Sequence, residues 1–227
     1  MTDLTSSSRV PLTGPAWGPL APGPARHLVV LLHGLGADGS DLIELAPHWA
    51  TAAPHARFVA PDGPFPCDMA PYGRQWYSLQ DRAPPVVWAG IERAAPLLNA
   101  FIDAELEALN LTPDKLVLMG FSQGTIMALH IAPRRSEPVA GVMGFSGRLA
   151  SPERLAGETV SRPPILLIHG EEDQVVPVGE LAAAETALRA AGFTVESHRR
   201  PDLDHGIDAD GVALAAAFLA RVLGDAA

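Results

Sequence analysis

The sequence is poor in cysteine and in basic residues, and it has no long apolar run. Cys67 is the single cysteine of 227 residues, so no disulfide can form within the chain. The formal net charge of -10 argues against a nucleic-acid surface and against docking on anionic lipid. No run approaches the roughly 18 apolar residues of a membrane helix, and the N-terminus lacks the apolar centre of a signal peptide. These absences predict a cytoplasmic protein with no nucleic-acid partner and no integral membrane association.

The length suits one large α/β domain, and 48% hydrophobic residues supply a core for it. Residues 1–26 are rich in serine, proline and glycine, which predicts a flexible or loosely draped N-terminal arm. We therefore expect ordered structure to begin at His27 and one domain to cover residues 27–227.

Apolar runs that end near glycine alternate with helical patterns over the rest of the chain. Continuous apolar runs of this kind predict strands buried on both faces, and residues 193–200 alternate as expected of a strand nearer the edge. We expect strands at 27–34, 56–64, 114–120, 139–147, 164–170 and 193–200. We expect helices at 40–50, 86–110, 123–132, 152–158, 178–192 and 206–223. This order predicts a doubly wound, mostly parallel sheet with helices on both faces and ligands at the carboxyl ends of its strands.

The segment Gly120-Phe121-Ser122-Gln123-Gly124 matches the pattern G-x-S-x-G between a predicted strand and a predicted helix. A serine at such a turn is held in a strained backbone conformation, and side chains two residues away on either side would clash. The pattern in this setting predicts that Ser122 is a nucleophile. Ser146, in the similar stretch "GFSGRL", lacks the second glycine and is expected to serve a turn or a cap.

A serine nucleophile needs a base, and the base needs a carboxylate that orients it. In α/β-hydrolases the chain order is serine, acid, histidine, and His205 in the loop after the last strand satisfies it best. Asp173 is the leading acid because it lies deepest in the turn after the preceding strand. The rival acids are Glu171, Glu172, Asp202 and Asp204.

Backbone amides that bind an oxyanion are expected at two places. The first is the amide of Gln123, which follows the nucleophile, and the second lies in the glycine-rich segment 33–39, where Leu35 is the expected donor. The same segment lacks the glycine spacing and the lysine of a phosphate-binding loop. No cysteine and histidine cluster has metal-ligand spacing, and the expected chemistry needs neither a metal nor a cofactor.

Seven segments together resemble the phospholipase/carboxylesterase family of small α/β-hydrolases, which includes bacterial carboxylesterases and acyl-protein thioesterases. They are "LLHGLGADGSD", "RFVAPDGP", "RQWYSL", "GFSQGTIMAL", "GFSG", "PILLIHGEEDQVVP" and "DHGI". The resemblance implies an α/β-hydrolase fold, for which we expect no separate lid domain, and the same triad and oxyanion hole. It also implies that Trp76 and its loop line an acyl pocket. Met69 in that loop and Val176 after Asp173 are our further candidates for substrate contact.

We therefore expect a serine hydrolase that cleaves small carboxylic esters of short to medium acyl length. Acyl thioester or lysophospholipid hydrolysis by the same triad stays open, as does a homodimer formed through an apolar patch near the active site. A non-catalytic receptor or scaffold is the remote alternative, and it is disfavoured because no triad member is missing. Substrate choice should depend on the Pro-rich connection at residues 64–85, because such loops shape pockets.

Overall fold

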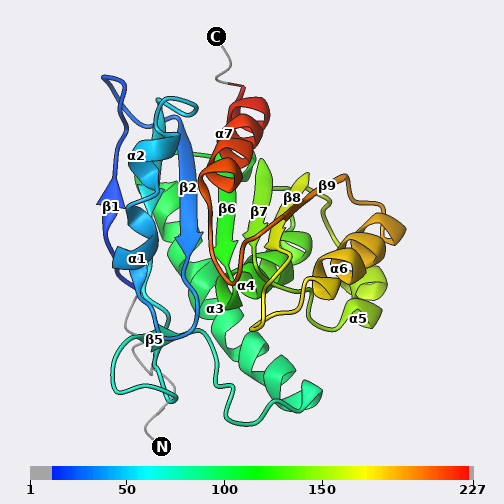
Figure 1. Ribbon diagram of the computed structural model, residues 1–227. Coiled ribbons are helices and arrows are strands. Elements are labelled where there is room, and N and C mark those ends of the chain that lie inside the picture. Colours follow the sequence, from blue (N-terminus) through cyan, green and yellow to red (C-terminus); the bar gives the residue numbers. More distant parts are fainter. Residues whose placement is uncertain (1–11, 225–227) are drawn as a thin grey trace, which may run out of the picture.

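The computed structural model describes residues 12–224, which form a central seven-stranded sheet in the order β1-β3-β2-β6-β7-β8-β9 (Figure 1). Neighbouring strands are parallel except for β1, which runs antiparallel to β3. The strands are β1 (Ala16–Trp17), β2 (His27–Leu32), β3 (Ala56–Val59), β6 (Leu116–Phe121), β7 (Gly141–Phe145), β8 (Ile165–Gly170) and β9 (Val195–Arg200). The predicted mostly parallel sheet is confirmed, with β9 at its edge.

Helices cover both faces of this sheet, as the alternation of strands and helices predicted (Figure 1). One core lies against α3 (Pro84–Leu109), α4 (Gln123–Ile131), α5 (Pro152–Glu158) and α6 (Gly179–Ala190). The other core lies against α1 (Gly39–Ile43), α2 (Ala46–Trp49) and α7 (Ala209–Leu223). Within residues 12–224, no helix is long and apolar enough to span a membrane.

The strand β2 explains why the central strands have continuous apolar sequences. Leu28, Val30 and Leu32 point into the core beside α3 and α4, whereas Val29 and Leu31 point into the core beside α2 and α7. Successive side chains of a strand alternate between faces, so a sheet covered on both faces needs apolar residues at every position.

The N-terminal arm is corrected by the structure where it is described. Ala16 and Trp17 pair with Val59 and Phe58 of β3, so ordered structure begins before His27. Residues 1–11 of the predicted arm lie outside the described residues. The proline-rich and glycine-rich composition misled the prediction because a strand of two residues leaves no periodic signal.

The helix predicted at residues 40–50 is also corrected, because α1 and α2 divide it between them. The cap of α1 is Asp38, whose carboxylate accepts the amide of Ser40. Pro47 lies in the first turn of α2, where a missing N–H costs no helical hydrogen bond.

The predicted connection at residues 64–85 contains a small antiparallel hairpin of β4 (Phe65–Pro66) and β5 (Arg74–Gln75). The backbone of Arg74 exchanges hydrogen bonds with Gly36 and Ala37 in the loop after β2. The hairpin therefore lies at the end of the sheet toward which β2 points, where Figure 1 shows β5.

Candidate active site

Ser122 occupies a sharp turn between β6 and α4 with φ of 52° and ψ of -112°. Its amide donates to the carbonyl of Phe145 on β7 at 2.8 Å. A Cβ atom at Gly124 would lie 1.8 Å from the Leu32 carbonyl oxygen, and one at Gly120 would lie 2.3 Å from the Gly124 backbone. The turn therefore requires both glycines, and positive φ at a serine is strain of the kind found at functional sites.

Asp173 and His205 come together from the loops that follow β8 and β9. His205 Nδ1 lies 2.7 Å from Asp173 Oδ2, and the other carboxylate oxygen accepts the amides of Val175 and Val176, each at 2.8 Å. Burial raises the pKa of Asp173, but the hydrogen bonds from His205 and the two amides outweigh it and hold the pKa below its ordinary value. The carboxylate is therefore ionised and fixes the orientation of the imidazole.

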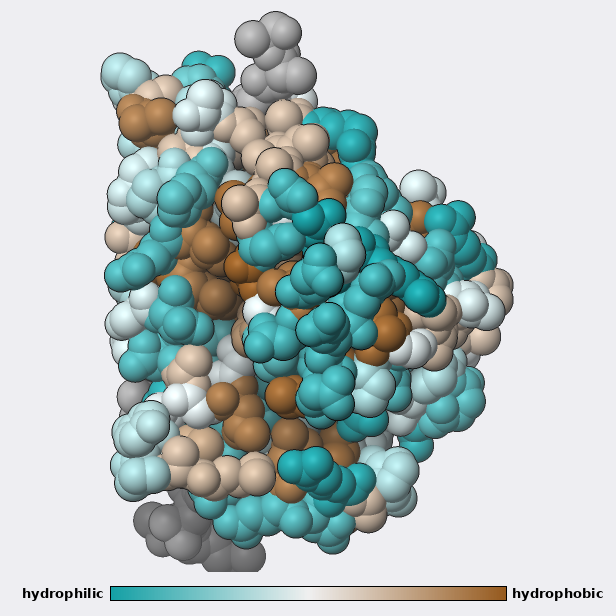
Figure 2. All heavy atoms as spheres, in the orientation of Figure 1, coloured by the Kyte–Doolittle hydropathy of each residue, from teal (hydrophilic) through white to brown (hydrophobic). Residues whose placement is uncertain are grey.

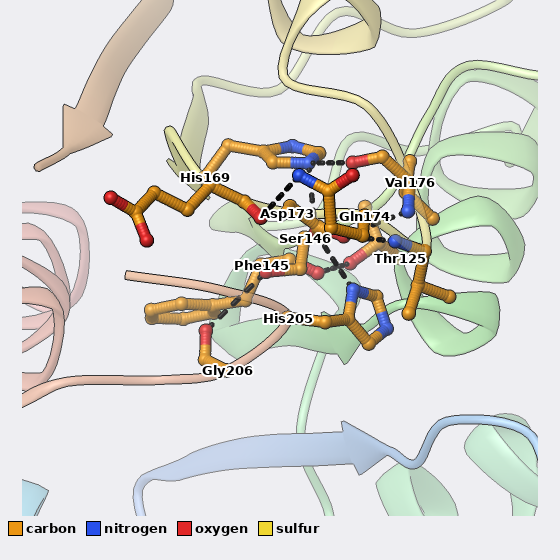
Figure 3. A network of polar contacts seen from close by, with 11 residues as sticks. Thr125, Phe145, Ser146, His169, Asp173, Gln174, Val176, His205 and Gly206 are labelled. Atoms are coloured by element: carbon orange, nitrogen blue, oxygen red, sulfur yellow. Dashed lines mark hydrogen bonds and ion pairs between the residues drawn. The ribbon is translucent and has the colours of Figure 1, made fainter. Parts of the chain in front are cut away.

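A second histidine contacts the same carboxylate, as Figure 3 shows. His169 Nε2 lies 2.7 Å from the carbonyl oxygen of Val176 and 3.2 Å from Asp173 Oδ2. A carbonyl only accepts hydrogen bonds, so Nε2 carries the proton and donates. His169 is fully buried. Its two contacts link Asp173 to the segment that contains Val176.

The amides of Leu35 and Gln123 have no hydrogen-bond acceptor among residues 12–224, although both residues line the cavity beside Ser122. Gln123 is the first residue of α4, and the first amides of a helix have no partner within it. Such free amides can bind an oxyanion if they face the reacting carbonyl.

Buried polar side chains hold the loop of Leu35 in place. His33 donates from Nδ1 to the Gly34 carbonyl at 2.7 Å, and its Nε2 accepts the Gly63 amide at 2.8 Å. Burial lowers the pKa of His33, which favours this neutral tautomer. The indole of Trp76 donates to the His33 carbonyl at 3.0 Å. The hydrogen bonds of the His33 ring and of the Trp76 indole together fix the backbone next to Leu35.

The side chain of Gln123 connects the serine turn to the connection at residues 64–85. Its amide oxygen accepts the backbone N–H of Trp76, and its amide nitrogen donates to the carbonyl of Tyr77, both at 2.8 Å. Gln123 is 2% exposed, so these bonds form away from water and fix the wall of the cavity.

The cavity that these elements enclose has a volume of about 430 Å³. Five of the predicted site residues line it: Ser122, His205, Leu35, Gln123 and Val176. Apolar side chains, among them Leu79, Phe121 and Ile126, complete its wall. Figure 2 shows hydrophobic residues gathered below the carboxyl ends of the strands, with hydrophilic residues around them.

Two predicted substrate contacts are corrected. Trp76 is fully buried, and its indole is directed to the His33 carbonyl, so it supports the cavity from behind and does not line it. Met69 is 50% exposed and is not among the residues that line the cavity. Tyr77, the next residue after Trp76, lines the cavity instead, and sequence reasoning missed it along with Arg148.

The rival residues lie elsewhere. Ser146 also has positive φ, but its hydroxyl donates to the Gly206 carbonyl at 3.3 Å and so supports the loop of His205. The acids Glu171, Glu172, Asp202 and Asp204 are all exposed. In the part of the chain that the structure describes, no cluster of three or more His, Cys, Asp or Glu side chains could hold a metal ion.

A strained serine and a hydrogen-bonded Asp–His pair at the carboxyl edge of a doubly covered parallel sheet are typical of an α/β-hydrolase. Solved esterase structures share this fold. More narrowly, the chain belongs to the phospholipase/carboxylesterase family, whose model matches residues 21–223. It is therefore a hydrolase of an esterase family.

Relatives with names and structures support this assignment. Esterase YpfH of Escherichia coli (strain K12) is 33% identical over 186 residues, which cover 82% of this chain and 78% of that protein. Acyl-protein thioesterase 1 of Schizosaccharomyces pombe is 34% identical over 157 residues, or 66% of this chain and 69% of that protein. The crystal structure of esterase PE8 has 40% sequence identity and a TM-score of 0.90, covering 94% of this chain and all of that one.

Proposed function

We propose that this protein hydrolyses carboxylic esters through an acyl-enzyme on Ser122, with His205 as base and Asp173 as the orienting acid. The observation that carries the proposal is the 2.7 Å contact between Asp173 and His205, with His205 and the strained Ser122 on one cavity. The relatives named esterase support the same reaction class.

In the first step, Ser122 Oγ attacks the acyl carbonyl carbon while His205 Nε2 takes the hydroxyl proton. The bond between the carbonyl carbon and the alcohol oxygen then breaks, and the imidazolium returns the proton to the leaving alcohol. Asp173 holds Nδ1 in the protonated tautomer and stabilises the imidazolium. Water then attacks the acyl-enzyme with His205 again as base, which releases the acid and restores Ser122.

The free amides of Leu35 and Gln123 are our candidates for the oxyanion hole. Charge develops on the carbonyl oxygen during attack, and two fixed N–H donors stabilise it more than they stabilise the substrate. Loss of one such donor reduces kcat on the order of 10² to 10³ in serine hydrolases.

The cavity of about 430 Å³ with an apolar wall favours acyl groups of short to medium length. The test is a series of 4-nitrophenyl esters of increasing acyl length, with Ser122→Ala as the inactive control. We expect kcat/KM to peak at short or medium chains. A peak at palmitoyl length would contradict this substrate class, and equal turnover by Ser122→Ala would contradict the mechanism.

Thioester hydrolysis is the second candidate, because the relative from Schizosaccharomyces pombe is named acyl-protein thioesterase 1. The same nucleophile cleaves both bonds, so the two candidates differ in the leaving group alone. Kinetics on an oxyester and a thioester with the same acyl group compare them directly. A ratio of kcat/KM that favours the thioester far beyond its greater intrinsic reactivity would replace the ester proposal.

A further inference from the structure

A second cavity adjoins the active-site cavity and shares charged residues with it. It has a volume of about 330 Å³ and lies beside Trp88 and the residues after β7. Arg82, Arg148 and Glu180 line both cavities. A substrate bound at Ser122 can therefore extend toward these three charged residues, and their charges indicate which chemical groups on the substrate would bind there.

Arg148 differs from the other half-buried arginines of residues 12–224. Each of the others donates to a carbonyl or side-chain oxygen; they are Arg57, Arg74, Arg134, Arg135 and Arg200. Arg148 has no hydrogen-bond acceptor and no ion-pair partner among the described residues. A guanidinium partly removed from water without an acceptor is unfavourable, so an acceptor from a ligand would stabilise it.

Tyr77 forms the part of the active-site wall on which the charge of Arg148 acts. It is 1% exposed and lines the active-site cavity, and its hydroxyl has no hydrogen-bond partner among the described residues. Burial raises the pKa of Tyr77 and the charge of Arg148 partly opposes this, so the two groups interact and the hydroxyl stays protonated. A buried phenol without a partner is rare, but this hydroxyl has almost no accessible surface, so Tyr77 forms part of the cavity wall and does not itself contact a ligand.

The local sequence fixes Arg148 in this position. Ser146 at the end of β7 has φ of 48°, and Gly147 follows it. A Cβ atom at Gly147 would lie 2.3 Å from Thr125 Cβ and 3.0 Å from the Ser122 carbonyl oxygen. The backbone just before Arg148 therefore packs against the serine turn, and Arg148 and Ser122 line one cavity.

We propose that Arg148, with the exposed Arg82 that lines the same two cavities, binds an oxyanion on the ester substrate, remote from the scissile carbonyl. This proposal rests on the ester hydrolysis proposed above and names the substrate class: esters that carry a second, ionised carboxylate or phosphate. The planar guanidinium offers parallel N–H donors that fit two oxygens of such a group. Glu180 is the acid that lines the same two cavities, and it forms no ion pair with either arginine within residues 12–224.

The test compares three esters of one activated alcohol and equal acyl length, whose far ends carry a carboxylate, a phosphate or a neutral amide. For each enzyme, kcat/KM on an anionic ester is divided by kcat/KM on the neutral ester. We expect Arg148→Met to lower this ratio about 10- to 100-fold, chiefly through KM, because a remote contact contributes to binding. Glu180→Gln should raise it.

Arg199→Met is the matched control, because Arg199 is exposed on β9 and does not line either cavity. A fall of the ratio for the carboxylate alone, the phosphate alone or both supports the subsite and identifies the oxyanion. A ratio that Arg148→Met leaves unchanged overturns it. Ester hydrolysis itself fails separately, if the wild-type protein cleaves none of the three esters.

Discussion

The replacement Asp173→Asn tests the geometry around the proposed base. In the structure, one carboxylate oxygen faces the N–H groups of His205 and His169, and the other faces the amides of Val175 and Val176. An asparagine has one oxygen and one NH₂ group. In either orientation its NH₂ meets N–H donors, so hydrogen bonds are lost on one side whichever way it turns.

The expected magnitude follows from the burial of Asp173, whose side chain has no exposed surface. A buried donor left unpaired costs about 1–3 kcal/mol, so Tm should fall by roughly 2–12 °C for a chain of this size. With the carbonyl toward the two amides, His205 must place its proton on Nε2 and cannot accept one from Ser122. We therefore expect kcat to fall on the order of 10⁴-fold, as an orienting Asp→Asn change does in a serine protease.

The assay is ester hydrolysis at saturating substrate, with thermal unfolding of the same preparations. Asp204→Asn is the matched control, because Asp204 is the exposed neighbour of His205. It should change stability by no more than about 0.5 kcal/mol and leave kcat close to the wild-type value. The reasoning is refuted if Asp173→Asn retains wild-type kcat or if Asp204→Asn causes the larger loss.

Three further replacements test the support of the site and the stability of the fold. His169→Leu removes the donor shared by Asp173 and the Val176 carbonyl, so kcat should fall roughly 10-fold, whereas His169→Gln should recover most of the loss by restoring an N–H. Burial is the main cause that lowers the pKa of His130 to about 4 in the folded protein. As pH falls from about 6.5, His130 is therefore protonated in the unfolded chain before it is protonated in the folded protein. Stability should then fall by about 3 kcal/mol between pH 6.5 and pH 4, and His130→Leu should remove that part of the slope in urea titrations. Gly124→Ala should cost at least about 3 kcal/mol and abolish turnover, because its Cβ would lie 1.8 Å from the Leu32 oxygen.

Each of these expectations has a clear contrary result. Equal losses in His169→Leu and His169→Gln would show that the N–H group is not what matters. An unchanged pH slope in His130→Leu, with the slope retained in the surface control His48→Leu, would assign the acid sensitivity to other groups. A stable and active Gly124→Ala protein would contradict the close approach of α4 to β2.

The sheet was predictable because its central strands are buried on both faces. That burial favours apolar residues at most positions of β2, β6 and β8, which is a strong local signal. The meeting of Asp173 and His205 was predictable for a related reason: each follows a strand, and parallel strands deliver their carboxyl ends to one edge. The two residues of β1 left no such signal, since a strand so short has no period.

The residues that form the cavity wall were less predictable than the proposed catalytic residues. Trp76 and Tyr77 are adjacent, and the sequence does not reveal which of the two faces the substrate; the bonds from Gln123 to their backbones determine this. Arg148 was not predicted because the sequence does not show whether an arginine has a hydrogen-bond acceptor. Unpaired polar groups are properties of packing, and no local pattern encodes them.

Labelling with a fluorophosphonate, followed by mass mapping of the modified peptide, tests the central claim most directly. The account predicts one label per chain, on the peptide that contains Ser122, with none on the folded Ser122→Ala protein. His205→Ala should be labelled far more slowly, because the serine would lack its base. A folded wild-type protein that takes no label, or takes it at Ser146, would contradict the assignment of Ser122 as the nucleophile.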